Sequence, residues 1–187
     1  MTRSIPALAA AVLISLGCQP RPAPPVDDPV EGPVEAVTHP ETGIALPRDY
    51  RETFTNYLSL DRVQNHNQII RLFANDVAMR GPDAANDLPN GSVIVAEVYR
   101  AKLDAEGEVE LSALGRRIRD GMAVIAVMER GDHLGAGYPE GLSNGQWDFA
   151  AFTPEGAPAG ADLNTCRACH APLTETDHLF SIEHIRE

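Results

Sequence analysis

Strict alternation of side chains predicts that residues 92–102 form a β-strand. The stretch is rich in β-branched residues and follows Asn90-Gly91, a pair that favours a tight turn. On a strand, neighbouring side chains point to opposite faces of the sheet. One face would carry Val93, Val95, Glu97, Tyr99 and Ala101, and the other would carry Ile94, Ala96, Val98, Arg100 and Lys102.

Four other stretches are predicted to be strands. Residues 67–75 and 122–129 are short apolar runs, and the first of them fits a strand better than a helix. Residues 146–152 alternate large and small side chains, as a half-buried strand does. A last strand is expected over residues 178–185, where it would pack on the same sheet.

Helices are predicted to be few and short. Apolar residues recur every three or four positions from Tyr50 to Leu58, which predicts a helix over residues 48–59. Gly, Pro, Asn and Asp predict a loop with at most one helical turn in residues 76–91. Residues 104–121 would form a hairpin-like excursion or a short helix. The fold class is therefore α+β, mainly an antiparallel sheet with a few short helices.

Residues 1–18 have the features of an export signal. Arg3 supplies positive charge ahead of an apolar run that is too short to span a membrane. The run ends at Gly17-Cys18, which resembles a bacterial lipoprotein cleavage site with Cys18 as the lipidated residue. Ser15 stands where such sites usually have Leu, so a plain secretory signal with an incidental Cys18 is the alternative. Both interpretations place the protein in the periplasm or cell envelope.

The remaining composition divides the chain into a tether and a domain. Residues 19–45 are rich in Pro and acidic residues and predict a disordered tether in which His39 faces solvent. The folded domain would cover residues 46–187. The net charge of −12 argues against nucleic acid or an anionic membrane surface as a partner. Membrane contact is therefore expected only through the N-terminal lipid.

The strongest chemical signal is Cys166-Arg167-Ala168-Cys169-His170. Cys-x-x-Cys-His is the attachment signature of c-type haem, in which two thiols bond to the porphyrin and the His binds iron. Cysteines three residues apart lie on one side of a helix, and Asp162 or Asn164 would cap such a helix. The sequence thus predicts a C-terminal haem-binding helix. One covalent haem c would be held by Cys166, Cys169 and His170.

Two other interpretations of the cysteine pair remain open. A redox dithiol normally opens a helix that follows a strand in a βαβ unit, and no βαβ pattern precedes this pair. A structural zinc site needs four ligands, and the chain contains no second Cys pair to complete it. Covalent haem in the purified protein would distinguish the cytochrome from both alternatives.

Several stretches together resemble the cytochrome P460 family. The resemblance covers about residues 46–185 and implies a fold similar to that of the β-type cytochromes c′, with one five-coordinate haem. It also implies oxidation of hydroxylamine or binding of nitric oxide. The specific feature is the C-terminal position of the haem motif in a β-rich domain. The matching stretches are His66-Asn67-Gln68-Ile69, Phe73-Ala74-Asn75-Asp76, Leu88–Val95, Trp147–Phe152, the Cys-x-x-Cys-His motif, and Asp177-His178 with Phe180.

One position departs from the family pattern. The resemblance implies a lysine bonded to the porphyrin on the strand after the Pro-x-Gly turn, and that position falls near Ala96 or Glu97. Lys102 is the only lysine in the chain and lies on the same predicted face as Ala96. Six residues of strand, about 20 Å, separate the two, so a cross-link through Lys102 requires a register shift. The alternative for Lys102 is a solvated strand end.

Residue types also suggest how the iron would be used. No methionine follows His170, and the other histidines on predicted loops and termini are expected to be surface or hydrogen-bonded residues, so an open axial position is expected. These histidines are His66, His133, His178 and His184. Three methionines are predicted core residues: Met79, Met122 and Met128. Candidates for a distal proton acceptor, which hydroxylamine oxidation requires, are Glu97, Glu129 and Glu140.

Two function classes remain open from the sequence. In the first, an enzyme oxidises hydroxylamine and passes electrons to a soluble cytochrome. In the second, a non-catalytic haem protein binds nitric oxide or carries single electrons. A lysine-linked haem favours the first class and an ordinary c-type haem the second. A thiol-based redox module is a third and more distant interpretation, and a homodimer is an open question.

Overall fold

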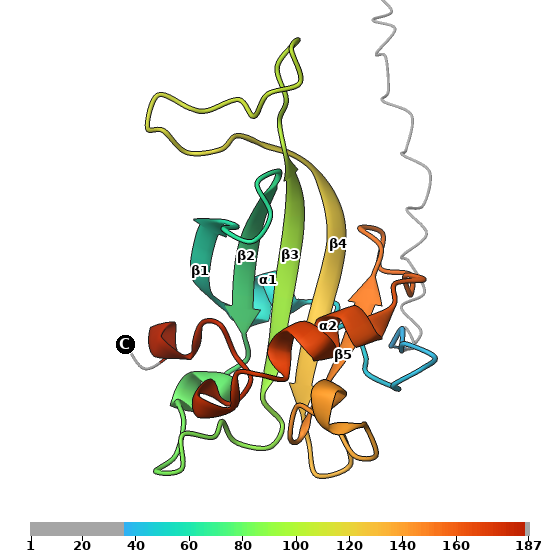
Figure 1. Cartoon of the computed structure of the whole chain (residues 1–187). Coiled ribbons are helices and arrows are strands. Elements are labelled where there is room, and N and C mark those ends of the chain that lie inside the picture. Colours follow the sequence, from blue (N-terminus) through green and yellow to red (C-terminus); the bar gives the residue numbers. More distant parts are fainter. Residues whose placement is uncertain (1–35, 186–187) are drawn as a thin grey trace, which may run out of the picture. The chain divides into compact units, whose positions relative to one another are not determined.

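A five-stranded antiparallel sheet forms the centre of the structure, a computed structural model that describes residues 36–185 (Figure 1). The strands pair in chain order, β1-β2-β3-β4-β5. This arrangement, with few and short helices, confirms the predicted fold class. The strands are β1 (Thr55–Asp61), β2 (Gln68–Ala74), β3 (Val93–Ala101), β4 (Arg119–Arg130) and β5 (Trp147–Phe152). The helices are α1 (Tyr50–Thr53) and α2 (Leu163–His170), with 3-10 turns η1 (Ala78–Arg80), η2 (Glu140–Leu142), η3 (Thr174–Thr176) and η4 (Ile182–His184).

Three strands lie where the hydrophobic pattern predicts them. β2, β3 and β5 match the predicted stretches, and β4 begins three residues before the predicted one. Gly91 takes the left-handed conformation that its turn requires, with a φ of 83°, and its N–H donates to the Arg130 carbonyl. The turn therefore fixes the register in which β3 pairs with β4.

The predicted helix over residues 48–59 is wrong beyond its first turn. α1 ends at Thr53, and the chain continues as β1, which pairs with β2. The three- and four-residue spacing arises because the register shifts between Asn56 and Leu58, so Tyr57 interrupts the two-residue alternation. Pairing with a neighbouring strand overrides the local helical pattern here.

The predicted last strand over residues 178–185 is also wrong. This segment contains η4, and the side chains of Ile182 and Ile185, three residues apart, are both buried. A one-turn helix buries this pair because residues three apart share a face. Tyr57 on β1 contacts the same segment through a hydrogen bond of 2.9 Å with Ser181.

Strand β5 is more deeply covered than the prediction of a half-buried strand implies. All six of its residues are buried. Trp147 and Phe149 pack in one hydrophobic cluster, and Ala150 and Phe152 pack in the other. Other parts of the chain therefore cover both faces of β5, whereas its alternation of large and small side chains predicted one buried face and one exposed face.

The folded region begins earlier than the predicted boundary at residue 46. Ile44 is 2% exposed and belongs to a hydrophobic cluster, and Thr38 forms a β-bridge with Ala45. His39 is 5% exposed and its ring lies 6.1 Å from that of Phe152, so the expectation that it faces solvent is wrong. The export signal, Cys18 and the tether before residue 36 lie outside the described residues.

Residues 102–118 form a hairpin-like excursion, one of the two forms predicted for residues 104–121, whose last three residues belong to β4 instead. The excursion extends past the end of the sheet (Figure 1) and is held by two isolated bridges, Leu103 with Val109 and Leu111 with Arg117. Lys102 donates its N–H to the Ile118 carbonyl at the base. Within residues 36–185, no helix is long and apolar enough to cross a membrane.

Candidate functional site

Helix α2 carries the whole Cys-x-x-Cys-His motif. Asp162 is its N-cap, and its side chain accepts a hydrogen bond of 3.0 Å from the Asn164 N–H, as one of the two predicted caps would. The helix ends at His170, two residues before Pro172. Cys166 and Cys169 are both free thiols, and Cys166 packs against a hydrophobic cluster while Cys169 is exposed. Burial raises the pKa of the Cys166 thiol, whereas redox-active dithiols depend on a lowered pKa.

Arg167, between the two cysteines, anchors α2 to the edge of the sheet. Its side chain is nearly fully buried, and Nε donates to Asp148 on β5 at 2.9 Å. A second nitrogen donates to Glu41 of the N-terminal segment at 2.9 Å, and the guanidinium lies 4.1 Å from the ring centre of Tyr138. Sequence reasoning missed this residue because the two positions between the cysteines are variable in the motif.

The imidazole of His170 is held by the chain that follows it. Nδ1 lies 2.7 Å from the carbonyl oxygen of His178, so Nδ1 carries the proton and Nε2 is the nitrogen suited to bind a metal. The rings of Phe149 and Phe180 flank the imidazole at 5.1 and 5.0 Å. Burial lowers the pKa of His170, which keeps the ring neutral, the form in which imidazole binds metals.

A buried ion pair fixes the loop that supplies this carbonyl. Asp177 accepts hydrogen bonds from Arg130 at 2.5 Å and from the Leu88 N–H at 2.8 Å. Asp177 and His178 both have positive φ values, 49° and 61°. Residues other than glycine take this conformation at a cost of about 1 kcal/mol or more, so surrounding contacts must hold them there.

The two faces of the sheet differ in how completely they are covered. We call the face that contacts α1 the closed face; on it Phe73, Val95 and Val127 are at most 2% exposed. On the opposite face, α2 and the C-terminal segment cover one end, where Ile94, Met128 and Phe149 are buried. Figure 1 shows α2 in front of the strands and α1 behind them.

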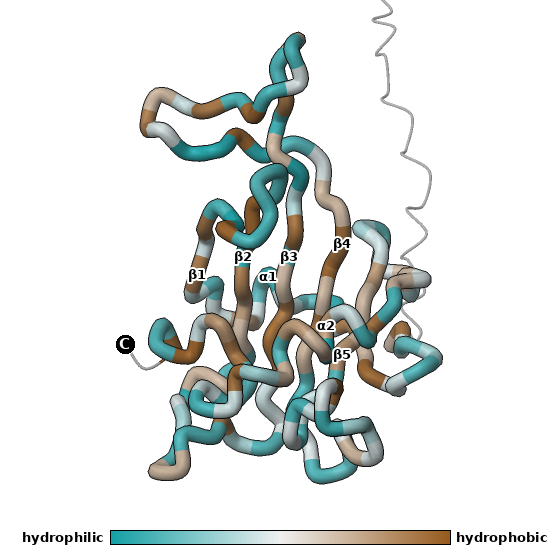
Figure 2. Tube along the Cα trace, in the orientation of Figure 1, coloured by the Kyte–Doolittle hydropathy of each residue, from teal (hydrophilic) through white to brown (hydrophobic). Residues whose placement is uncertain are grey.

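Beyond α2, the second face carries an apolar surface that we call the open patch. All seven of its side chains are hydrophobic and all are partly exposed. Figure 2 shows hydrophobic stretches along β2, β3 and β4 in this region. The patch consists of Leu58 and Leu60 of β1, Ile70 and Leu72 of β2, Ala96 of β3, and Val124 and Ala126 of β4.

Small residues occupy the middle of the open patch. Leu72, Ala96 and Ala126 pair directly across β2, β3 and β4, so their side chains lie side by side on one face. The side chains of Ala96 and Ala126 are smaller than those of the neighbouring pairs, so they leave more room above the sheet. A contiguous, partly exposed apolar surface of this kind marks a site of interaction with a ligand or partner.

The predicted distal carboxylates do not lie on the open patch. Glu97 is fully buried on the closed face, where Tyr50, Tyr99, Arg51 and Arg71 all donate to it. Glu129 pairs with Val93 and shares its closed face. Glu140 is exposed in η2. Glu97 and Glu129 are therefore not placed to accept a proton on the open patch, and a role for Glu140 stays a prediction from residue type.

Lys102 lies at the base of the excursion, one residue past the end of β3. Its ammonium is half exposed and pairs with Glu110 at 2.7 Å. Ala96, at the position where the family resemblance implies a lysine, faces the open patch, whereas its neighbour Glu97 faces away. The solvated, ion-paired position matches the alternative interpretation of Lys102 as a strand end.

The other predicted residues have the secondary roles expected of them. His66 and His133 are exposed, and His184 is partly buried in η4. Met128 is a core residue, and Met79 and Met122 pack against the two hydrophobic clusters. Among residues 36–185, no three His, Cys, Asp or Glu side chains are grouped as a metal site.

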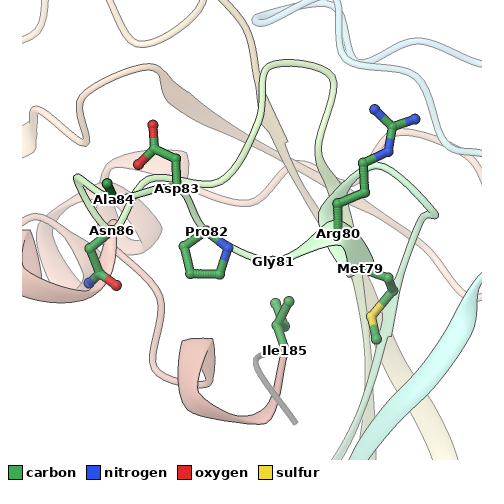
Figure 3. Close-up of a pocket in the computed structure, with 8 residues that line it drawn as sticks. All are labelled: Met79, Arg80, Gly81, Pro82, Asp83, Ala84, Asn86 and Ile185. Carbon is green, nitrogen blue, oxygen red and sulfur yellow. The ribbon is translucent and has the colours of Figure 1, made fainter.

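A separate hollow of about 610 Å³ lies beside the loop that follows β2 (Figure 3). Ile185 lines it from the C-terminal segment, and none of the residues of the haem motif does. The other lining residues are Met79, Arg80, Gly81, Pro82, Asp83, Ala84 and Asn86.

Comparison with known families supports the resemblance seen in the sequence. The family model of cytochrome P460 matches residues 47–181, which include all five strands and α2. No protein of curated function matches the sequence. The chain therefore belongs to the cytochrome P460 family and is a haem-binding cytochrome.

Proposed function

We propose that the protein is an exported c-type cytochrome that binds nitric oxide at an open axial position of one covalently attached haem. The observation that carries the proposal is the open patch, whose seven side chains are all apolar and include no acid or base. Such a surface beside the haem motif favours an uncharged diatomic ligand over a substrate that must lose protons.

The residues of α2 fit a covalently held haem. Cys166 and Cys169 are free thiols three residues apart on one helix, and His170 presents Nε2 while Nδ1 bonds to the His178 carbonyl. This donor set matches the chemistry of c-type attachment. We assign Cys166 and Cys169 as the attachment residues and His170 as the axial ligand.

Bound haem would supply an iron with one axial position for a small ligand. The chain's own residues hold the proximal imidazole, exclude water and limit the size of the ligand. Apolar side chains of the open patch, Leu72 and Val124 among them, would contact the macrocycle, and Ala96 and Ala126 leave space between them. The methyl groups of Ala96 and Ala126 cannot ligate iron or accept a proton.

Hydroxylamine oxidation is the alternative implied by the family, and the position of the carboxylates argues against it. A general base must lie within hydrogen-bond reach of the proton that it removes. Glu97 is buried on the closed face, where four donors already occupy its oxygens. A soluble cytochrome as electron partner would be needed by the enzyme or by an electron carrier, and nitric oxide binding alone does not require one.

Export and lipidation complete the proposal. The apolar run ending at Gly17-Cys18 would direct the chain to the periplasm or cell envelope, with Cys18 as the anchor. Cys18→Ser should release the protein in a soluble exported form, as membrane fractionation would measure. An unmodified protein that is already soluble, with a mature N-terminus beyond residue 18, would contradict the anchor.

Covalent attachment is tested by acid extraction of haem from the denatured protein. The unmodified protein should keep its haem, and the double variant Cys166→Ala/Cys169→Ala should lose it. Cys18→Ser is the matched control, since it removes the third cysteine and should keep the haem. Complete extraction from the unmodified protein would overturn covalent attachment.

The choice between ligand binding and catalysis is tested on the haem-loaded protein. Adding nitric oxide should shift the ferrous spectrum from a high-spin form, while hydroxylamine should give no turnover with an electron acceptor. Ala96→Glu places a carboxylate on the open patch and should weaken nitric oxide binding, whereas Ala113→Glu on the exposed excursion should leave it unchanged. Steady hydroxylamine oxidation by the unmodified protein would refute the binding function.

A further inference from the structure

A polar cluster lies behind the imidazole of His170, on the side away from Nε2. Arg130 at the end of β4 is buried and contacts three acceptors from separate segments: Asp177, Asp87 and Gln146. The Arg130–Asp177 pair is the shortest of these contacts, at 2.5 Å. Four segments of the chain therefore meet at this one guanidinium.

The ion pair acts on the backbone as well as on the side chains. Asp177 also accepts the Leu88 N–H at 2.8 Å, so its carboxylate bonds in two directions. It directly precedes His178, and both residues have positive φ. This left-handed pair turns the His178 carbonyl toward Nδ1 of His170, at 2.7 Å.

A second contact closes the loop onto the helix. Nδ1 of His178 lies 3.2 Å from the carbonyl oxygen of His170. The two histidines thus contact each other through opposite groups, ring to carbonyl and carbonyl to ring. The contact made by the His178 ring is the longer of the two. The shorter contact, from Nδ1 of His170 to the His178 carbonyl, is supported by the ion pair and fixes the imidazole of His170.

We propose that Asp177 and Arg130 are positioning residues that set the strength of the hydrogen bond from His170 Nδ1 to the His178 carbonyl, and thereby tune the haem iron. The inference rests on the proposed function only in taking His170 as the axial ligand. It assigns a role to a cluster that does not touch the iron site directly.

The physical link is the electron density on the imidazole. A short hydrogen bond from Nδ1–H makes the ring a stronger donor through Nε2, which favours the ferric state. Rotation of the carbonyl away from Nδ1 weakens that donation. The reduction potential then rises, and the iron–histidine stretching frequency of the ferrous protein falls.

Two substitutions at one position separate the backbone effect from the side chain. His178→Gly removes the imidazole but keeps the carbonyl, and glycine adopts positive φ without strain. His178→Val disfavours positive φ because its side chain is β-branched. We expect a raised potential and a lower stretching frequency in His178→Val, and values close to those of the unmodified protein in His178→Gly.

Asp177→Asn tests the ion pair itself. Asparagine tolerates positive φ and can still accept the Leu88 N–H, but it loses the charged contact with Arg130, so the His178 carbonyl is held less firmly against Nδ1 of His170. Arg130 keeps its contact with Asp87. We expect the same direction of change as in His178→Val. Arg130→Lys keeps the positive charge but loses the several N–H donors of the guanidinium. Its reduction potential and stretching frequency should lie between those of Asp177→Asn and those of the unmodified protein. Glu110→Gln breaks the exposed pair with Lys102 and should change neither quantity.

The outcomes distinguish the two proposals. Unmodified protein without covalent haem would overturn the proposed function. Haem-loaded unmodified protein, with His178→Val and His178→Gly giving equal potentials and stretching frequencies, would overturn the positioning role. The glycine and valine pair decides whether the His178 carbonyl tunes the iron. Asp177→Asn and Arg130→Lys decide whether the ion pair acts through it, and unchanged values in whichever of the two folds would overturn that part.

Discussion

The two faces of the sheet are built from the same strands but are completed differently. On the closed face, Phe73, Val95 and Val127 are at most 2% exposed, because α1 and the N-terminal segment cover them. One residue away on the same strands, Leu72, Ala96 and Ala126 are partly exposed. The chain thus provides its own cover for one face and leaves much of the other to a ligand.

The difference also separates stability from function. The closed face contains a buried carboxylate with four donors around it, an arrangement that specifies one packing. The open patch contains no polar side chain, so no hydrogen bond there specifies one packing arrangement. Substitutions on the closed face should therefore change unfolding, and substitutions on the open patch should change ligand binding.

Truncation of neighbouring residues on β2 gives the largest expected contrast. Phe73→Ala should lower the free energy of unfolding by about 3–5 kcal/mol, since a large buried ring leaves a cavity. Leu72→Ala, on the open patch, should cost clearly less because Leu72 is already partly exposed. Urea unfolding measures both. Equal losses would show that the two faces are equally packed.

Glu97 gives the second contrast. Burial alone would raise the pKa of Glu97, but hydrogen bonds from Arg51, Tyr99 and Tyr50 outweigh burial and lower it. Glu97→Gln should cost about 3 kcal/mol, the low end for a broken buried pair, because Arg51 is half exposed. The haem spectrum should not change, since Glu97 faces away from the open patch.

The pH dependence of unfolding follows from the same carboxylate. Because the folded-state pKa is lowered, ionised Glu97 stabilises the fold fully above the unfolded pKa of about 4.3. That stabilisation is lost as the pH falls through the folded pKa. Acid titration of Glu97→Gln should show a shallower loss of stability below about pH 4.3 than the unmodified protein. Parallel curves would contradict the assignment.

Filling the open patch should change ligand binding more than folding. Ala96→Phe places a ring beside Ala126, and overpacking of this kind costs about 1–3 kcal/mol. A similar cost for crowding against the bound ligand would lower nitric oxide affinity about fivefold to 150-fold, as ligand titration of the ferrous protein would measure. Unchanged affinity would place the ligand elsewhere.

The smallest effect is expected at Lys102. Lys102→Ala removes an exposed ion pair with Glu110 and should leave the free energy of unfolding nearly unchanged, because solvent screens such pairs. The mass and spectrum of the haem-bearing protein should fit attachment through two thioethers alone, with or without Lys102. A change in the haem spectrum of Lys102→Ala would restore the cross-link hypothesis.

Periodicity predicted most of the sheet and failed where pairing decided the structure. β3 follows from alternation and from Asn90-Gly91, both local features. β1 was missed because a register shift beside Tyr57 produces helix-like spacing. Such a register shift depends on how β1 pairs with β2, so it cannot be predicted from the residues of β1 alone.

Of the candidate site, only the haem motif was predictable from the sequence. The motif placed Cys166, Cys169 and His170 on one helix, as the structure has them. Alternation also placed Glu97 and Ala96 on opposite faces, but only the position of α2 shows which face is the functional one. The roles of Arg167 and of the Asp177–Arg130 pair depend on long-range contacts that leave no pattern in the sequence.

The order of the strands has a consequence for how the protein is made. Each strand pairs with the next one along the chain, so all five can assemble before α2 leaves the ribosome. The haem motif then docks last, onto a sheet whose closed face is already complete. Until haem is bound, the folded apoprotein would expose the apolar side chains of the open patch to water. We expect this maturation intermediate to bind hydrophobic dyes and to be the species most prone to aggregation.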